Sequence, residues 1–168
     1  MKFLPFDSIT FRTKLKESEV LARLKQNVGP NRIFEIRSDY STPFRGRITG
    51  DRFVIKRKIN YRNSFRPVIH GWIEDVFTET VIHVKMRLTI EVIIFMTIWF
   101  GAIGFACLCI ILVALSDFKK ANYSDVIPTF IICAMLIGGY LLTIMSFNAE
   151  RKKAKEKLQE IFDAETSE

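Results

Sequence analysis

The stretch from Ile59 to Asp75 carries the side chains of this sequence that are best suited to chemistry. It reads INYRNSFRPVIHGWIED and sets arginine and histidine among strand-forming residues. A guanidinium group is a planar fork of N–H donors that matches phosphate or carboxylate oxygens. The sequence therefore predicts an anion-binding cluster made of Arg57, Arg62, Arg66 and His70. The alternative is an ordinary turn, in which Asn63 and Ser64 bond their own backbone and the arginines face solvent or headgroups.

The histidines are the candidates for acid–base or metal chemistry, and there are two, His70 and His83. With Glu74 or Glu79 they could hold a metal ion, but nothing in the sequence brings these side chains together. The sequence has no G-x-S-x-G, no Walker-type loop and no H-E-x-x-H segment. We therefore expect no catalytic residue, no metal and no cofactor, and a protein that is not an enzyme.

Two long apolar segments dominate the second half of the chain. Residues 92–115 and 126–147 are 24 and 22 residues long and contain no charge. At about 1.5 Å per residue, either one is long enough to cross a hydrocarbon core of about 30 Å. We predict a transmembrane hairpin over residues 89–147, with the connecting loop SDFKKANYSD. The alternative, two core helices of a soluble bundle, would require a polar face, which neither segment has.

The distribution of lysine and arginine around this hairpin predicts its orientation. Seven basic residues flank it on the side of the two termini, against two in the loop, Lys119 and Lys120. Because basic residues remain on the cytoplasmic side, both termini should be cytoplasmic. The cysteines, Cys107, Cys109 and Cys133, all lie in the apolar segments, so no disulfide framework is expected.

The first 88 residues read as a small strand-rich domain. Alternation and helical spacing predict a strand at 8–15, a helix at 16–28 and a possible strand passing into a loop at 32–43. Further strands are predicted at 44–50, 52–61, 65–75 and 80–88, and Pro67 should make the third of these an edge strand or an irregular start. A last helix at 148–168 carries an apolar patch, Leu158, Ile161 and Phe162, that can pack on the sheet or on the membrane surface.

This order of elements predicts an α+β fold, a small antiparallel sheet with flanking helices, plus the transmembrane hairpin. A strand, a helix, a meander and a closing helix are similar to the helix-grip arrangement of START-like lipid-binding domains. A pleckstrin-homology-like barrel, also closed by a C-terminal helix, is the alternative.

The strand-rich segment also carries a resemblance at the level of residues. The run FRGRITGDRFVIKRKINYRNSFRPVIHGWIED, followed by TVIHVKMRLT, resembles small two-pass bacterial membrane proteins of no assigned activity. Their pattern is F-x-G-x-[IV] followed by F-x-I-x-R-x-I-x-Y-R-N-S-F-x-P-x-I-x-G-x-I. The resemblance covers about residues 1–162 and implies an integral protein of a bacterial plasma membrane.

The distribution of charge predicts which surface the domain before the hairpin contacts. Residues 1–91 hold 18 Lys/Arg and 10 Asp/Glu, within a chain of net charge +7. A basic domain tethered at the cytoplasmic leaflet faces anionic headgroups, and Lys56, Lys58, Arg62 and Arg66 are the expected contacts. We expect a membrane-anchored binding or scaffolding module for a lipidic or anionic ligand, with the bilayer, a protein partner or a second copy as partner, and no nucleic acid. The alternative is a subunit that assembles into a membrane complex through its hairpin.

Overall fold

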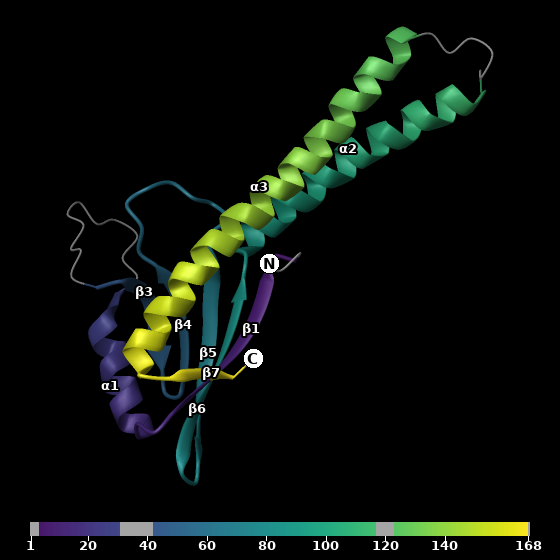
Figure 1. Ribbon diagram of the computed structural model, residues 1–168. Coiled ribbons are helices and arrows are strands. Elements are labelled where there is room, and N and C mark those ends of the chain that lie inside the picture. Colours follow the sequence, from purple (N-terminus) through teal and green to yellow (C-terminus); the bar gives the residue numbers. More distant parts are fainter. Residues whose placement is uncertain (1–3, 31–41, 117–122, 168) are drawn as a thin grey trace. The chain divides into compact units, whose positions relative to one another are not determined.

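The computed structural model describes residues 4–30, 42–116 and 123–167, and it forms two compact units. The first unit comprises residues 1–89 with 146–168, and the second comprises residues 90–145. Figure 1 shows the elements of both. Most of the strand considered at 32–43, and most of the loop between the apolar segments, lie outside the described residues.

A seven-stranded sheet forms the frame of the first unit, in the order β2-β3-β4-β5-β6-β1-β7. Its strands are β1 (Phe6–Thr13), β2 (Val28–Pro30), β3 (Phe44–Thr49), β4 (Arg52–Arg57), β5 (Val68–Val76), β6 (Glu79–Arg87) and β7 (Glu165–Ser167). Neighbouring strands run antiparallel, except that β2 runs parallel to β3. The predicted α+β class is confirmed, and the sheet is mixed where the sequence predicted an antiparallel one.

The helices are α1 (Glu17–Asn27), α2 (Ile90–Ser116) and α3 (Tyr123–Phe162). The sequence suggested a second apolar helix and a separate last helix, but α3 continues through both. Between Tyr140 and Phe162 there is neither proline nor glycine to interrupt it. The helix ends where Asp163 adopts a left-handed φ of 46° and the N–H of Ala164 bonds to the carbonyl of Gln159.

One face of the sheet is covered and forms the core. Its strand residues are buried: Ile9, Phe11, Phe53, Ile55, Ile69, Ile73, Ile82, Val84 and Met86. Val20 and Leu24 of α1 and Leu158 and Phe162 of α3 are fully buried as well, and the yellow end of α3 lies along the strands in Figure 1. Each such side chain contributes about 1.5–3 kcal/mol by leaving water, so this layer stabilises the unit.

Aromatic rings fill the space between the sheet and α3. The ring of Phe162 lies 5.8 Å from Phe11 and 6.3 Å from Phe53, measured between centroids. Gly71 is part of this packing, because a Cβ at that position would overlap the ring of Phe53. The space in which a helix-grip domain would hold a lipid therefore contains side chains of the protein itself.

Strand β5 corrects one prediction about Pro67. The strand begins at Val68 and lies between β4 and β6, so it is not an edge strand. Pro67 precedes the first residue of the ladder, where its missing N–H removes no inter-strand hydrogen bond. The other reading of this proline, an interruption just before the strand, agrees with the structure.

Two helical segments of the described residues can cross a membrane by length and composition. They are Ile90–Leu112, with a mean hydropathy of 2.4, and Phe130–Phe162, with a mean hydropathy of 2.2, of which the part up to Met145 belongs to the second unit. A Cβ added at Gly139 would lie 3.7 Å from Trp99 and 3.8 Å from Phe100, which is ordinary van der Waals contact, so α2 and α3 pack against each other at this level.

Candidate anion-binding face

The four residues predicted to bind an anion do not come together as one cluster. Arg57, at the end of β4, points to the covered face. Its Nε donates to Glu150 of α3 at 3.1 Å, and its Nη2 donates to the hydroxyl of Tyr61 at 3.1 Å. Tyr61 in turn donates to the other carboxylate oxygen of Glu150, which is 2 % exposed. The guanidinium of Arg57 is thus used to neutralise a buried carboxylate, which is a structural task.

Arg62 and Arg66 lie in the loop between β4 and β5. Arg66 donates to the backbone carbonyl of Arg57 at 3.4 Å, while the side chain of Arg62 is exposed. The turn reading holds for Asn63, whose side-chain oxygen accepts a hydrogen bond from the N–H of Phe65 at 2.9 Å. These contacts fix the loop and leave Arg62 available at the surface.

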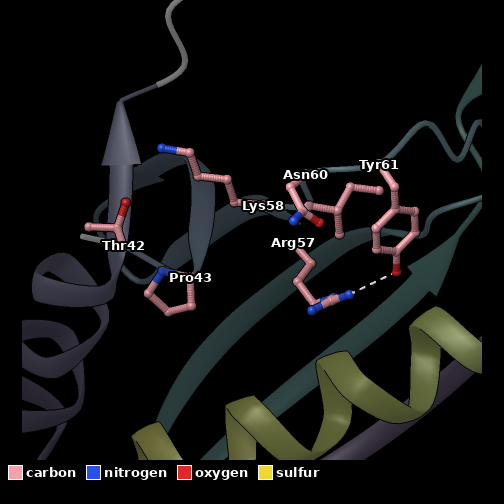
Figure 2. Close-up of a pocket in the computed structure, with 7 residues that line it drawn as sticks. Thr42, Pro43, Arg57, Lys58, Asn60 and Tyr61 are labelled. Atoms are coloured by element: carbon pink, nitrogen blue, oxygen red, sulfur yellow. Dashed lines mark hydrogen bonds between the residues drawn. The ribbon is translucent and has the colours of Figure 1, made fainter. Parts of the chain in front are cut away.

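A pocket of about 200 Å³ lies beside this loop, lined by Thr42, Pro43, Arg57, Lys58, Ile59, Asn60 and Tyr61. In Figure 2 the side chains of Arg57 and Lys58 extend away from each other, and Arg57 points to Tyr61. The two positive groups therefore do not converge on one ligand position. Of these two, Arg57 is engaged by Tyr61 and Glu150.

His70 points the opposite way, onto the open face of the sheet. Strand register orders that face into rows that run across β3, β4, β5, β6 and β1. The first row is Arg45, Lys56, Val68, Arg87 and Phe6, the second is Arg47, Val54, His70, Lys85 and Ser8, and the third is Thr49, Arg52, Trp72, His83 and Thr10. Neighbouring strands are about 5 Å apart and successive rows about 7 Å, so these side chains share one compact surface.

Positive charge is concentrated in these three rows. We call the basic face the set Arg45, Arg47, Arg52, Lys56, Lys85, Arg87 and His70. No register position of the three rows holds a carboxylate, and the nearest ones follow at the far end, Glu74 beside the third row and Glu79 at the β5–β6 turn. The side chains of Arg47, Arg52, Lys85 and Arg87 are exposed. Like charges on neighbouring strands oppose folding, so an anion bound here would relieve repulsion.

The pKa of His70 also reflects the positive charge of the basic face. Burial lowers the pKa of His70 below its ordinary value of 6.5, and the positive charges of Arg87 and Lys56 lower this pKa further. His70 is thus neutral at neutral pH in the free protein. A bound anion would favour its protonated form, which makes the imidazole a donor that responds to occupancy of the face.

The third row contains a polar cluster around His83. Its ring stacks on Trp72 with centroids 4.8 Å apart, its Nδ1 lies 3.4 Å from the hydroxyl of Thr10, and its Nε2 lies 3.5 Å from Glu74. A carboxylate, an imidazole and a hydroxyl in sequence can activate a nucleophile. At Thr10, however, β1 is paired with both β6 and β7, so ladder bonds occupy the backbone N–H groups that could stabilise an oxyanion. These contacts fix the His83 ring against Trp72 on the open face.

Reasoning from the sequence missed most of the basic face. Alternation within β3 and within β6 already places Arg45 with Arg47, and Lys85 with Arg87, on one face of their strands. What a single sequence does not reveal is that β4 and β5 lie between these strands in a register that aligns their basic residues into three rows. Of the four residues expected to meet headgroups, Lys56 lies in the basic face, whereas Lys58, Arg62 and Arg66 lie beyond the end of β4.

Two charged residues of α3, Glu150 and Arg151, form buried ion pairs with the sheet. Arg151 donates to the carboxylate of Asp7 at 2.9 Å, and the Asp7 side chain is 5 % exposed.

Comparison of the chain with protein-family models, with curated proteins and with solved structures finds no match. The assignment of a function therefore rests on the geometry and charge of the basic face.

Proposed function

We propose that this protein is a membrane-anchored, non-enzymatic binding module whose basic face recognises a phosphate-bearing anion. The observation that carries the proposal is the segregation of charge on the open face, six Lys/Arg side chains in three rows without a carboxylate. The two apolar helices supply the anchor. Arginine and lysine are the residues that phosphate oxygens select, and here they lie on rigid strands.

The interior of the sheet is a weaker candidate for the ligand. Phe11, Phe53 and Phe162 occupy the space under α3, so a lipidic ligand there would have to displace well-packed rings. A helix-grip arrangement is the fold type that we favour over a closed barrel, because the strand order is linear with β2 and β7 at its two ends. On this proposal the domain keeps the grip frame and binds on its outer face.

The proposal is tested on the full chain in nanodiscs of neutral phosphatidylcholine, with inositol hexakisphosphate as the phosphate probe. The triple variant R47Q/K85Q/R87Q should bind the probe about tenfold more weakly, which corresponds to about 1.4 kcal/mol. Binding by the unmodified chain should also weaken with salt, because exposed charges are screened over about 8 Å at physiological ionic strength.

A matched control removes the same charge elsewhere. Lys14, Lys16 and Lys25 are exposed and lie on or next to α1. The triple variant K14Q/K16Q/K25Q should bind the probe within about twofold of the unmodified chain, since charges beyond a Debye length contribute little. Equal losses in the two triple variants would show a general effect of net charge and would remove the basic face as the site.

A subunit role in a membrane complex is the second candidate, and one observation favours it. A Cβ built at Gly101 or at Gly104 of α2 meets no described atom within 4 Å. Small residues that leave such a surface allow another helix to approach. On this proposal G101L/G104L lowers the oligomeric state measured by crosslinking in detergent, and G139L, which crowds Trp99, serves as the contrast.

A further inference from the structure

We infer that the anion recognised by the basic face is the headgroup layer of the membrane that the apolar helices cross, and that the protein docks through the end of the sheet formed by the first row. This inference rests on the proposed function and names its ligand. Three features of the first unit bear on this choice. The chain path and the charge gradient distinguish this end of the sheet from the other, whereas exposed apolar side chains occur at both ends, with Phe77 and Val76 at the far tip.

The covalent path of the chain is the first feature. Arg87 is the last residue of β6, and α2 begins at Ile90, so Leu88 and Thr89 alone separate the first row from the first apolar helix. The three Cα–Cα steps from Arg87 to Ile90 reach at most about 11 Å. If α2 spans a bilayer, the backbone at Arg87 cannot lie far from the headgroup layer, whatever the orientation of the sheet.

Exposed apolar side chains at the same end are the second feature. Phe6 is the register partner of Arg87, and it is 49 % exposed on the open face. Leu4, two residues earlier, is 71 % exposed. An aromatic and an aliphatic side chain next to basic groups are the composition of a surface that enters the interfacial region, where apolar atoms leave water while charges contact headgroups.

The gradient of charge along the strands is the third feature. Proceeding from the first row, the open face changes from basic to mixed, with Glu74 and the ion pair of Arg12 with Glu79 at 3.9 Å. The far tip of the sheet, at the β5–β6 turn, carries Phe77 between acidic strand ends, Asp75 and Glu79. An anionic surface would attract the first row, at about 1 kcal/mol for each basic residue close to it, and would repel the far tip.

Other occupants are less well matched to these features. A nucleic acid or an acidic protein would neutralise the cations of the second and third rows. Neither partner would account for the exposed apolar side chains of Phe6 and Leu4 beside Arg87. Both would bind the basic face in a neutral bilayer as well as in an anionic one, and this difference separates them from headgroups in the experiment.

The test places a tryptophan at the first row. In the background Trp72→Phe and Trp99→Phe, which removes the two native tryptophans, the full chain carries Phe6→Trp and is placed in nanodiscs with brominated acyl chains. We expect fluorescence to be quenched at least about twofold more in discs with anionic phosphatidylserine than in neutral discs. The added substitutions R47Q, K85Q and R87Q should abolish the difference. Phe77→Trp in the same background is the control for the far tip and should be unaffected by lipid charge.

Each outcome decides between the ideas. Quenching of Phe6→Trp that depends on anionic lipid and on the three basic residues supports headgroup docking. If quenching is equal in anionic and neutral discs while inositol hexakisphosphate still binds in an Arg47-, Lys85- and Arg87-dependent way, the proposed function stands and the membrane is not its ligand. If neither probe depends on those residues, both proposals are overturned. Quenching of Phe77→Trp in place of Phe6→Trp overturns the assignment of the docking end.

Discussion

Gly71 shows how one residue can set the packing of the core. It lies on the covered face of β5, and the ring of Phe53 occupies the place of a side chain. We expect Gly71→Ala to destabilise the protein by about 1–3 kcal/mol, because overpacking forces a ring or the backbone to move. Chemical denaturation of the full chain in detergent, followed by Trp72 fluorescence in a Trp99→Phe background, measures the change.

The double variant Gly71→Ala/Phe53→Leu distinguishes a clash with the Phe53 ring from a loss of backbone freedom at position 71. A smaller side chain at position 53 leaves room for the new methyl group, so the double variant should be more stable than the sum of the two single effects by about 1 kcal/mol or more. Simple additivity would mean that Gly71 is needed for its own conformation rather than for Phe53.

His70 gives the basic face a predictable response to pH. The residues around it are positive: Lys85 lies directly opposite on β6, Arg87 and Lys56 lie in the next row, and Arg47 lies beyond Val54 on β3. Burial lowers the pKa of His70, and the positive charges of Arg87 and Lys56 lower it further. A bound anion raises that pKa again, so affinity should increase as pH falls and should level off below the pKa of the free protein, which is under 6.5.

The probe for this pH dependence is sucrose octasulfate, whose own charge does not change between pH 5 and pH 8. We expect about a threefold to tenfold gain in affinity between pH 8 and pH 5, since one added charge contributes about 1 kcal/mol. His70→Gln should remove most of the gain. His83→Gln, at the other histidine, should leave it in place, and the reverse pattern would assign the titration to the third row. Without an anion, the stability of the protein should decrease as pH falls, whereas anion affinity increases. The reason is that the pKa of His70 is lower in the folded state than in the unfolded state, so protonation favours the unfolded state.

At the scale of elements, two buried ion pairs join α3 to the sheet. Consecutive residues of the helix are used: Glu150 contacts Arg57 of β4 at 3.1 Å, and Arg151 contacts Asp7 of β1 at 2.9 Å. Their carboxylates are 2 % and 5 % exposed, whereas the arginines are 22 % exposed. The helix is therefore held at a defined rotation and height, beyond what the apolar contacts of Leu158 and Phe162 alone would specify.

This arrangement predicts a strongly non-additive pair. Glu150→Leu leaves the guanidinium of Arg57 without its carboxylate and should cost up to about 3–5 kcal/mol, at the lower end because Arg57 keeps some solvent. Arg57→Met with Glu150→Leu should recover most of the loss, since an apolar pair of similar volume replaces both charges. The same denaturation assay measures both. If the double variant is as unstable as Glu150→Leu alone, the pair does not act as a unit.

The elements show what a single sequence can and cannot specify here. Alternation in β1, β4 and β6, and helical spacing in α1, predict those elements because each buries one face and exposes the other. Arg57 could be recognised as the one charge on the apolar face of its strand. Its ion-pair partner Glu150 is 93 positions away, and the sequence near Arg57 does not identify it. The basic face was missed for the same reason, since its rows depend on register between strands that are distant in sequence.

For the molecule as a whole, charge is distributed in two ways that favour the orientation we predict. Lysine and arginine flank the apolar helices on the side of the termini, and the basic face occupies the end of the sheet from which the chain enters α2. Both distributions place positive charge on the side that carries the sheet. Cytoplasmic leaflets are the anionic ones, so the positive-inside tendency and headgroup docking require the same side of the membrane.

The orientation can be tested with a reporter that is active only outside the cytoplasm. Fused after Glu168, alkaline phosphatase should remain inactive, because seven basic residues hold the termini inside against two in the loop. Fused after Ser116 in a chain truncated there, the same reporter follows a single span and should be active. The reverse pattern would place the sheet outside the cytoplasm, where the surface is less anionic. Headgroup docking would then lose its electrostatic basis, while recognition of a soluble phosphate-bearing anion by the basic face would remain possible, so the two fusions decide which ligand the face can meet.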